Sequence, residues 1–308
     1  MIEGQEDVTW AQWVALAQAC EEHGVATLFR SDHYLSVSGY EGRGSLDAWT
    51  TLAGLAAVTS RLRLGVLVSP ATFRHPSVLA KNVTAVDHIS GGRVELGIGA
   101  GWNEREHAAY GFDFPALGAR MELLEEQLRI VRGAWADGPF THEGANYRLV
   151  ALDEQPKPVQ RPHPPIIIGG GAKPRTARLA ARYADEYNTV FATPAECAER
   201  RAVVERAWAE ADRDPASLTF SVMVPWLSGS DEADLRRRAA RTAAWRGEGD
   251  AASVIAEFAA VGVAGSFEES VARLRAYRDA GIDRIMLQHL LHDDVEAVAL
   301  LPRLAAAL

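Results

Sequence analysis

Residues 166–188, IIIGGGAKPRTARLAARYADEYN, contain a strand, a turn, a helix and a second strand in succession. The isoleucines Ile166–Ile168 are typical of a strand that is buried on both faces, as in a parallel sheet. Gly169–Gly171 permit a sharp turn, and the segment after Pro174, rich in alanine and arginine, favours a helix. Asp185–Val190 is predicted to be the next strand. The stretch therefore predicts one βα unit of an α/β fold.

The same alternation recurs along the other parts of the 308-residue chain. Further strands are predicted at Ile2–Gly4, Val25–His33, Leu62–Val68, Val94–Gly101, Leu218–Val224 and Asp283–His289. Helical periodicity or capping signals mark Ala48–Thr59, Pro76 to Gly91, Met121–Trp135, Ala195–Ala211 and Ser266 to Gly281. Eight strands separated by helices favour closure into a (β/α)8 TIM barrel, formed as a single domain over residues 1–308.

Two longer segments interrupt this alternation, at about residues 137–164 and 226–265. The first contains a predicted β-hairpin at Phe140–Leu152. We expect both to decorate the barrel as insertions, after the fourth and the seventh βα unit.

Composition excludes several classes of protein. The net charge of −9, without a block of lysine or arginine, argues against binding to nucleic acid. No apolar run approaches the roughly 20 residues of a membrane span, and the N-terminal residues do not form a signal peptide, so a cytoplasmic protein is expected. Cys20 and Cys197 are expected to be inert thiols. The scattered His33, His75 and His289 do not form a metal site.

The three consecutive glycines lie where barrels of this kind often bind phosphate, in a late loop at the start of a helix. Bare N–H groups and the positive end of the following helix attract an anion, and Lys173 and Arg175 could add positive charge. The glycines also permit a tight turn that merely begins the helix. We favour the phosphate site, because a plain turn rarely needs three glycines.

Other predicted strand ends carry polar and aromatic side chains. His33 could donate or accept a proton with Asp32 fixing its orientation, although a hydrogen-bonded loop histidine is also possible. Glycines around Ala100 permit a flat ring to lie against the main chain, and Asn103 or Glu104 could bond to that ring or cap the next helix. Further candidates at strand ends are Asn188, Trp226, Gln288 and His289.

Several long motifs, in the same order, resemble the luciferase-like monooxygenases, and most closely the actinobacterial branch that uses the deazaflavin coenzyme F-420. The matching stretches are FRSDHYLS (29–36), residues 72–111, PKPVQRPHPPIIIGGGA (156–172) and ARYADEYN (181–188). Residues 264–288 are similar to the last βα unit of the family. The resemblance implies a barrel that binds a flavin or deazaflavin across the C-terminal ends of its strands.

The resemblance also implies roles for individual residues. His33, with Asp32, would be catalytic beside the reactive ring, and the ring would rest near Leu67-Val68, where the family often has a non-prolyl cis peptide. The residues expected to bind the cofactor are Leu67, Val68, Ala100, Gly101, Asn103, Gly169, Gly170, Gly171, Ala172 and Lys173. The expected substrate pocket comprises Tyr34, Trp102, Glu104, Trp226 and His289, and these aromatic residues could equally be packing.

Two departures from the family pattern stand out. About six residues usually precede the counterpart of Ile2, so the first strand is expected to be short and Met1 to be an internal start. Ala172 also stands where a fourth glycine is common. If that position has a positive φ, alanine would weaken phosphate binding; if it is helical, nothing is lost.

These observations predict a hydride-transferring oxidoreductase that uses coenzyme F-420 and a small organic substrate. The alternative is a monooxygenase that uses reduced FMN and oxygen, with a non-catalytic flavin-binding protein as a third reading. The family also implies a homodimer. The sequence leaves the identity of the substrate open.

Overall fold

The computed structural model describes residues 1–40 and 42–308. Its strands are β1 (Thr27–Arg30), β2 (Arg63–Pro70), β3 (Val94–Gly99), β4 (Phe140–Glu143), β5 (Arg148–Leu152), β6 (Ile166–Gly169), β7 (Glu186–Val190), β8 (Thr219–Ser228), β9 (Val263–Gly265) and β10 (Arg284–Gln288). Its helices are α1 (Trp10–Glu22), α2 (Ala48–Val58), α3 (Pro76–Ser90), α4 (Glu104–Tyr110), α5 (Leu117–Trp135), α6 (Pro174–Tyr183), α7 (Pro194–Glu210), α8 (Glu232–Arg246), α9 (Ala251–Val261), α10 (Phe267–Asp279) and α11 (Leu300–Ala306), with 3-10 turns η1 (Pro215–Ser217) and η2 (Val295–Ala299).

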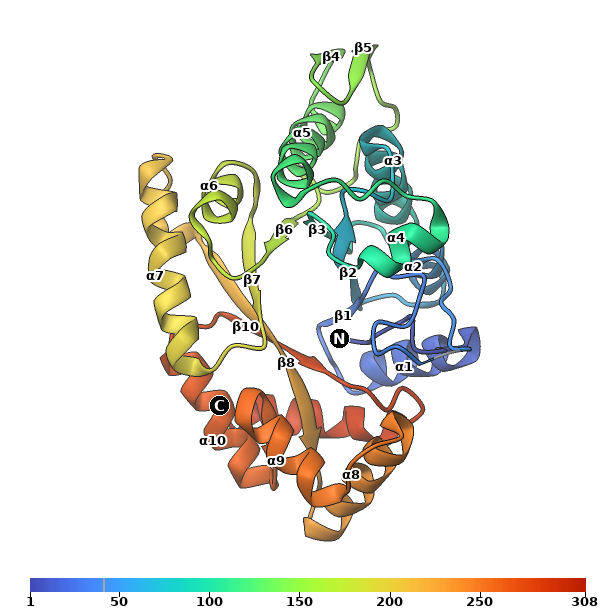
Figure 1. The fold of residues 1–308 in the computed structure, drawn as a ribbon, viewed down its shortest axis with the longest axis vertical. Helices are drawn as coiled ribbons and strands as arrows, with labels where there is room; N and C mark the ends of the chain where they lie inside the picture. The colour runs from blue at the N-terminus through green and yellow to red at the C-terminus, as the bar shows by residue number, and fades with distance from the viewer. Residues whose placement is uncertain (41) are drawn as a thin grey trace.

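The strands form a curled parallel sheet covered by helices (Figure 1). Its order is β1-β2-β3-β6-β7-β8-β10, and β9 pairs with the end of β8. Chain order therefore equals spatial order, as expected when each helix returns the chain to the next parallel strand. The α/β class and the βα repeat are confirmed.

Helix boundaries follow the signals in the sequence. Thr9 and Ser266 each form a capping box, with Gln12 and Glu269 respectively. Gly91 ends α3 with a φ of 67°, which glycine adopts without a steric penalty. Capping satisfies N–H groups that a helix leaves free, so these residues fix where the helices begin.

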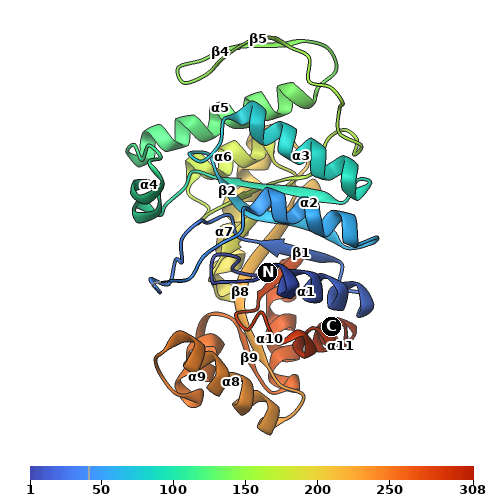
Figure 2. The same cartoon turned by 90° about the vertical axis from the view of Figure 1, so that its right-hand side faces the viewer.

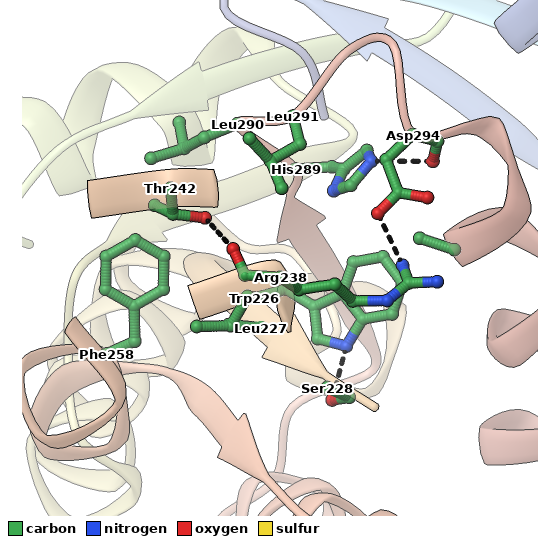
Figure 3. A pocket seen from close by; sticks show the side chains of 11 residues that line it. Trp226, Leu227, Ser228, Arg238, Thr242, Phe258, His289, Leu290, Leu291 and Asp294 are labelled. Carbon is green, nitrogen blue, oxygen red and sulfur yellow. Dashed lines mark hydrogen bonds and ion pairs between the residues drawn. The ribbon is translucent and has the colours of Figure 1, made fainter. Parts of the chain in front are cut away.

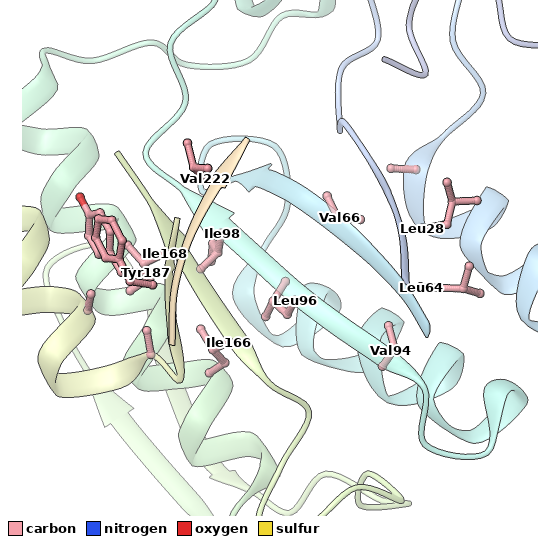
Figure 4. Packing of buried hydrophobic residues seen from close by; sticks show 14 of the residues in the cluster. Leu28, Leu64, Val66, Val94, Leu96, Ile98, Ile166, Ile168, Tyr187 and Val222 are labelled. Carbon is pink, nitrogen blue, oxygen red and sulfur yellow. The ribbon is translucent and has the colours of Figure 1, made fainter. Parts of the chain in front are cut away.

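Alternate residues along the strands point to opposite faces of the sheet. Leu64 and Val66 of β2 and Leu96 and Ile98 of β3 belong to the main apolar cluster, which includes the covering helices (Figure 4). The two-residue period of a strand sends the intervening residues to the inner face. The sheet thus packs on helices on one side and encloses an interior on the other.

The interior holds a second apolar cluster formed by Phe29, Leu67, Ile167, Met223 and Met286. Glycine at position 65 makes room for Phe29, because a Cβ there would lie 2.3 Å from the phenyl ring.

Charged residues occupy the N-terminal ends of the strands. Arg63 Nε donates to Glu95 (2.6 Å), and Arg284 bridges Glu95 (2.7 Å) and Glu186 (2.9 Å). Burial outweighs this bridge and raises the pKa of Glu186 to about 7.

The N-terminal residues lie between the two edges of the curled sheet. Ile2 N donates to Phe29 O (3.0 Å), and Ser31 N donates to Ile2 O (3.2 Å). On the other side, His289 N donates to Met1 O (2.9 Å). The predicted strand Ile2–Gly4 is therefore only a single bridge, yet its main chain connects β10 to β1.

The two segments expected as insertions lie at opposite ends of the molecule (Figures 1 and 2). Residues 137–164 include the antiparallel hairpin β4–β5, as predicted, and it projects beyond α5. Residues 226–265 form the end of β8, α8, α9 and β9, which share a separate apolar cluster that includes Leu235 and Phe258.

Candidate functional site

A cavity of about 980 Å³ lies over the C-terminal ends of the strands. Ten of the candidate residues line it: His33, Leu67, Val68, Ala100, Gly101, Trp102, Gly169, Gly170, Asn188 and Gln288. They come from the C-terminal parts of β1, β2, β3, β6, β7 and β10, or from the residues that follow them. The geometry is that of a ligand site built on parallel strands, where the C-terminal ends converge.

His33 is held by a carboxylate that the sequence did not reveal as its partner. Its Nδ1 lies 2.7 Å from Glu106 Oε2, and the side chain of Glu106 is fully buried in α4. The other oxygen of Glu106 accepts from the main-chain N–H groups of Tyr34 and Leu35. This arrangement leaves the second ring nitrogen, Nε2, without a hydrogen bond to the described residues, in a side chain that lines the cavity.

The charge of Glu106 favours the protonated form of the His33 ring. Burial lowers the pKa of His33, but the hydrogen bond to Glu106 and its charge outweigh burial, so that the pKa is raised above its usual value. Burial likewise opposes ionisation of Glu106, and the hydrogen bonds from His33, Tyr34 and Leu35 lower its pKa in net. Each partner therefore favours the charged form of the other, and Nε2 of His33 stays free to face a ligand.

The expectation that Asp32 orients His33 is wrong. The carboxylate of Asp32 accepts from Ser69 Oγ (2.7 Å) and from both terminal nitrogens of Arg74 (3.1 Å for Nη2 to Oδ1). Arg74 also bonds to Asp47 (2.7 Å). Because consecutive residues of an extended segment point to opposite sides, Asp32 and His33 face different partners. Asp32 fixes the loop that carries His33, through the end of β2.

The end of β2 has the backbone that the resemblance implied. The peptide bond Leu67-Val68 is cis, and the register between β2 and β3 shifts between Val66 and Ser69. Gly99 makes this bulge possible on the neighbouring strand, since a Cβ there would lie 2.8 Å from Val68 Cγ2. Leu67 and Val68 both line the cavity at this bulge.

The segment after β3 lines the cavity with its first residues and begins helix α4 with its last ones. Ala100 and Gly101 line the cavity, and Gly101 has a φ of 78°. Trp102 is 62% exposed and meets the ring of His33 edge-on, with 5.6 Å between the ring centroids. Asn103 is the N-cap of α4 and accepts from Glu106 N, and the exposed Glu104 is in its first turn. Of the two readings for Asn103, the helix cap is the one observed.

The glycine loop is partly occupied by protein atoms. Gly170 N donates to Asn188 O (2.9 Å) and Ala172 N donates to the Tyr187 hydroxyl (2.9 Å), so these two amides are not available to a phosphate. The expectation that all the amides of the glycine loop bind an anion is therefore wrong for Gly170 and Ala172. Ala172 has a φ of 51°, the left-handed conformation that disfavours alanine.

A smaller set of groups still fits a phosphate. The N–H groups of Gly171 and Lys173 have no hydrogen bond to the described residues, and nothing lies within 4 Å of a Cβ built on Gly171. α6 begins at Pro174, so the N–H groups of its first turn, Arg175 and Thr176, also lack helical partners. The loop and the first turn of α6 therefore offer four free N–H donors at the positive end of a ten-residue helix. The side chain of Lys173, at the N-cap of that helix, is exposed.

Three residues expected in the substrate pocket lie elsewhere. Tyr34 stacks on Phe73 with 5.2 Å between centroids, and its hydroxyl accepts from Arg74 (2.9 Å). Trp226 and His289 line a separate cavity of only about 10 Å³, together with Arg238 and Asp294 (Figure 3). Complete burial lowers the pKa of His289 to about 4, which keeps it neutral. All three are packing residues here.

Two features are absent from the described residues. Among residues 1–40 and 42–308, no three His, Cys, Asp or Glu side chains are arranged to hold a metal ion. Within the same residues, every helix is too short or too polar to cross a lipid bilayer.

Comparisons with known proteins agree with this geometry. An uncharacterized protein of Mycobacterium tuberculosis is 31% identical over 217 residues, which cover 65% of this chain and 74% of that protein. The FMNH2-dependent dimethylsulfone monooxygenase of Pseudomonas putida is 31% identical over 175 residues, 56% of this chain and 47% of that enzyme.

Among solved structures, an F420-dependent secondary alcohol dehydrogenase in complex with an F420-acetone adduct has a TM-score of 0.81. At 20% identity over 99% of this chain and 97% of that one, it shows a shared fold. The sequence profile of luciferase-like monooxygenases matches residues 2–284. The chain therefore belongs to the luciferase-like monooxygenase family.

Proposed function

We propose that the chain is an oxidoreductase that transfers hydride between coenzyme F-420 and a small organic substrate. The observation that supports this most is the free Nε2 of His33, a ring held by Glu106, in the wall of the cavity. A hydride acceptor that becomes an alcohol also needs a proton, and a protonated His33 would hold one at that position. When bound, the deazaflavin ring would supply or accept the hydride.

The residues present fit such a cofactor. The free amides of Gly171, Lys173, Arg175 and Thr176 would hold its phosphate group. Leu67, Val68, Ala100 and Gly101 would support the flat ring, because they line the cavity at the ends of β2 and β3. These roles are proposals that follow from position and chemistry.

In the reduction of a carbonyl substrate, the protein itself would donate a proton and keep water away from the reacting atoms. The bond between Nε2 of His33 and its proton breaks as the substrate oxygen gains that proton. Glu106 stays ionised and stabilises the imidazolium before the transfer. In the reverse reaction the neutral ring accepts the proton of the alcohol.

A second candidate is a monooxygenase that uses reduced FMN and oxygen. It is favoured by the FMNH2-dependent relative at 31% identity. The same loop would bind the FMN phosphate, and the same cavity would shield the ring from water. A non-catalytic flavin-binding protein is the third candidate.

Fluorescence titration with four ligands tests these proposals: F-420, FMN and the phosphate-free form of each. We expect F-420 to bind most tightly and loss of its phosphate to weaken binding at least roughly tenfold. Lys173→Ala should weaken binding of the phosphorylated form alone. Arg182→Ala, at the other end of α6, is the matched control.

Each outcome has a clear meaning. Tight binding of FMN alone contradicts the choice of F-420, and binding of neither cofactor contradicts the whole proposal. If His33→Ala binds the cofactor and turns over every accepted substrate at the wild-type rate, the chain is a non-catalytic binder or uses another acid.

We also propose a single domain, a homodimer and a cytoplasmic location. Size-exclusion chromatography with light scattering tests the dimer, because the mass expected for one chain is 33.4 kDa.

A further inference from the structure

Phe191 has an unusual combination of backbone and exposure. It directly follows β7, has a φ of 48°, and is held there by a hydrogen bond from its N–H to Met223 O (2.9 Å). A positive φ is uncommon for any residue with a side chain and is an outlier for a bulky one. Its side chain is 48% exposed and lines the large cavity. Strain at a site where a large apolar group faces a cavity is typical of a functional position.

The cavity that Phe191 lines is largely apolar. Beyond the strand ends assigned to the cofactor, the cavity is lined by Tyr40, by Val190 beside Phe191, and by Trp245 and Phe258 of the segment 226–265. Aromatic rings attract other flat rings in offset or edge-to-face arrangements. This part of the wall therefore suits a flat apolar molecule.

The charges of the cavity do not suit an anion. Its carboxylates are those of Glu3, Glu6, Glu248 and Glu257. Of the two lining side chains that carry positive charge, Arg246 pairs with Glu257 (2.8 Å) and Glu248 (3.2 Å), and His33 pairs with Glu106. Both positive charges of the described lining are already balanced by carboxylates, so burying a further negative charge there is costly.

We propose that Phe191 is a specificity-determining platform and that the substrate is an uncharged, flat apolar molecule that stacks on it. This inference rests on the proposed function only in calling the bound molecule a substrate. The stacking preference itself belongs to the cavity and can be measured in the absence of turnover.

The test compares three small probes by NMR titration of the full chain, with and without F-420. Acetophenone is flat and uncharged, cyclohexyl methyl ketone has the same carbon skeleton but is not flat, and benzoate is flat but anionic. We expect acetophenone to bind roughly 2- to 12-fold more tightly than the cyclohexyl ketone, the range of an aromatic pair. Benzoate should bind at least roughly tenfold more weakly than acetophenone.

Variants at the same position separate planarity from bulk. Phe191→Leu keeps an apolar side chain and should reduce the preference for acetophenone to about one, whereas Phe191→Tyr should retain it. Trp10→Leu replaces a half-exposed aromatic residue of α1 outside the cavity and should leave the preference unchanged. If Phe191 had only a structural role, Phe191→Leu would lower the stability of the fold without changing the ratio of the two ketone affinities.

A wild-type ratio near one, or a ratio unchanged in Phe191→Leu, overturns the platform. Benzoate that binds as tightly as acetophenone overturns the uncharged substrate. Failure of F-420 to bind, with the probe preference intact, contradicts the proposed cofactor and leaves the platform supported.

Discussion

Replacing Glu106 with glutamine isolates the charge that raises the pKa of His33. Glutamine has nearly the same shape, and its oxygen can still accept from Tyr34 N and Leu35 N, as Glu106 Oε1 does. Its amide nitrogen can then donate to Nδ1 of a neutral His33. The burial that lowers the pKa of His33 remains, while the charge that raises it is gone, so this pKa should fall.

The expected cost in stability follows from three hydrogen bonds. Glu106 accepts from His33, Tyr34 and Leu35, and a bond to a charged group contributes about 1 kcal/mol more than a neutral one. The variant should therefore lose about 3 kcal/mol near pH 6, or about 5 °C in Tm for a chain of this length.

The stability difference should depend on pH in a defined direction. The raised pKa of His33 means that the pair stabilises the fold fully below 6.5 and loses this contribution as pH rises through the folded pKa. The lowered pKa of Glu106 means that the contribution is also lost as pH falls through that value. The Tm difference should be largest at mildly acidic pH.

The assays are an NMR titration of the His33 ring and a Tm measured across pH. The matched control is Glu126→Gln, because Glu126 also pairs with a histidine, His142, at 2.9 Å, but does so beneath the hairpin β4–β5. The control should lose stability and leave the titration of His33 unchanged. A wild-type pKa for His33 in Glu106→Gln would refute the reasoning, as would an equal Tm loss at every pH.

Two further predictions concern stability. Ala172→Gly relieves a left-handed alanine at φ 51° and should stabilise the fold by up to about 1 kcal/mol. Ala151→Gly, at φ 48° in the hairpin, is a parallel test of the same backbone effect, and a lower Tm in both variants would contradict this account. Because burial raises the pKa of Glu186 to about 7 from 4.5, its ionisation should destabilise the fold by about 3 kcal/mol as pH rises between those values. Chemical denaturation at pH 4.5 and pH 8 should show that loss in the wild type and its absence in Glu186→Gln.

Much of the fold could be predicted because its signals are local. Runs such as Ile166–Ile168, the glycine at position 91 that ends α3, and the capping boxes at Thr9 and Ser266 each act within a few residues. The helices α8 and α9 were not predicted. The sequence of α8, EADLRRRAARTAAWR, has few large apolar residues, and it packs mainly against α9 and the end of β8.

The candidate site was harder to predict, because it depends on contacts between distant residues. Glu106 and His33 are 73 positions apart, and an acidic residue in the first turn of α4 is already explained by the helix dipole. The pairing of Asp32 with Arg74 likewise depends on the loop after β2. The resemblance supplied the cis peptide at Leu67-Val68, which no local physical signal indicates.

The packed interior beneath the cavity has a consequence for the order in which ligands bind and leave. Phe29, Ile167 and Met286 fill the space below the strand ends, and the Arg284 bridge occupies the opposite rim. Among the described residues, this packing leaves the mouth as the route into the cavity. A cofactor that binds against the floor, as proposed above, would have to enter before the substrate and leave after it. The proposed function therefore predicts steady-state kinetics with a compulsory order of binding.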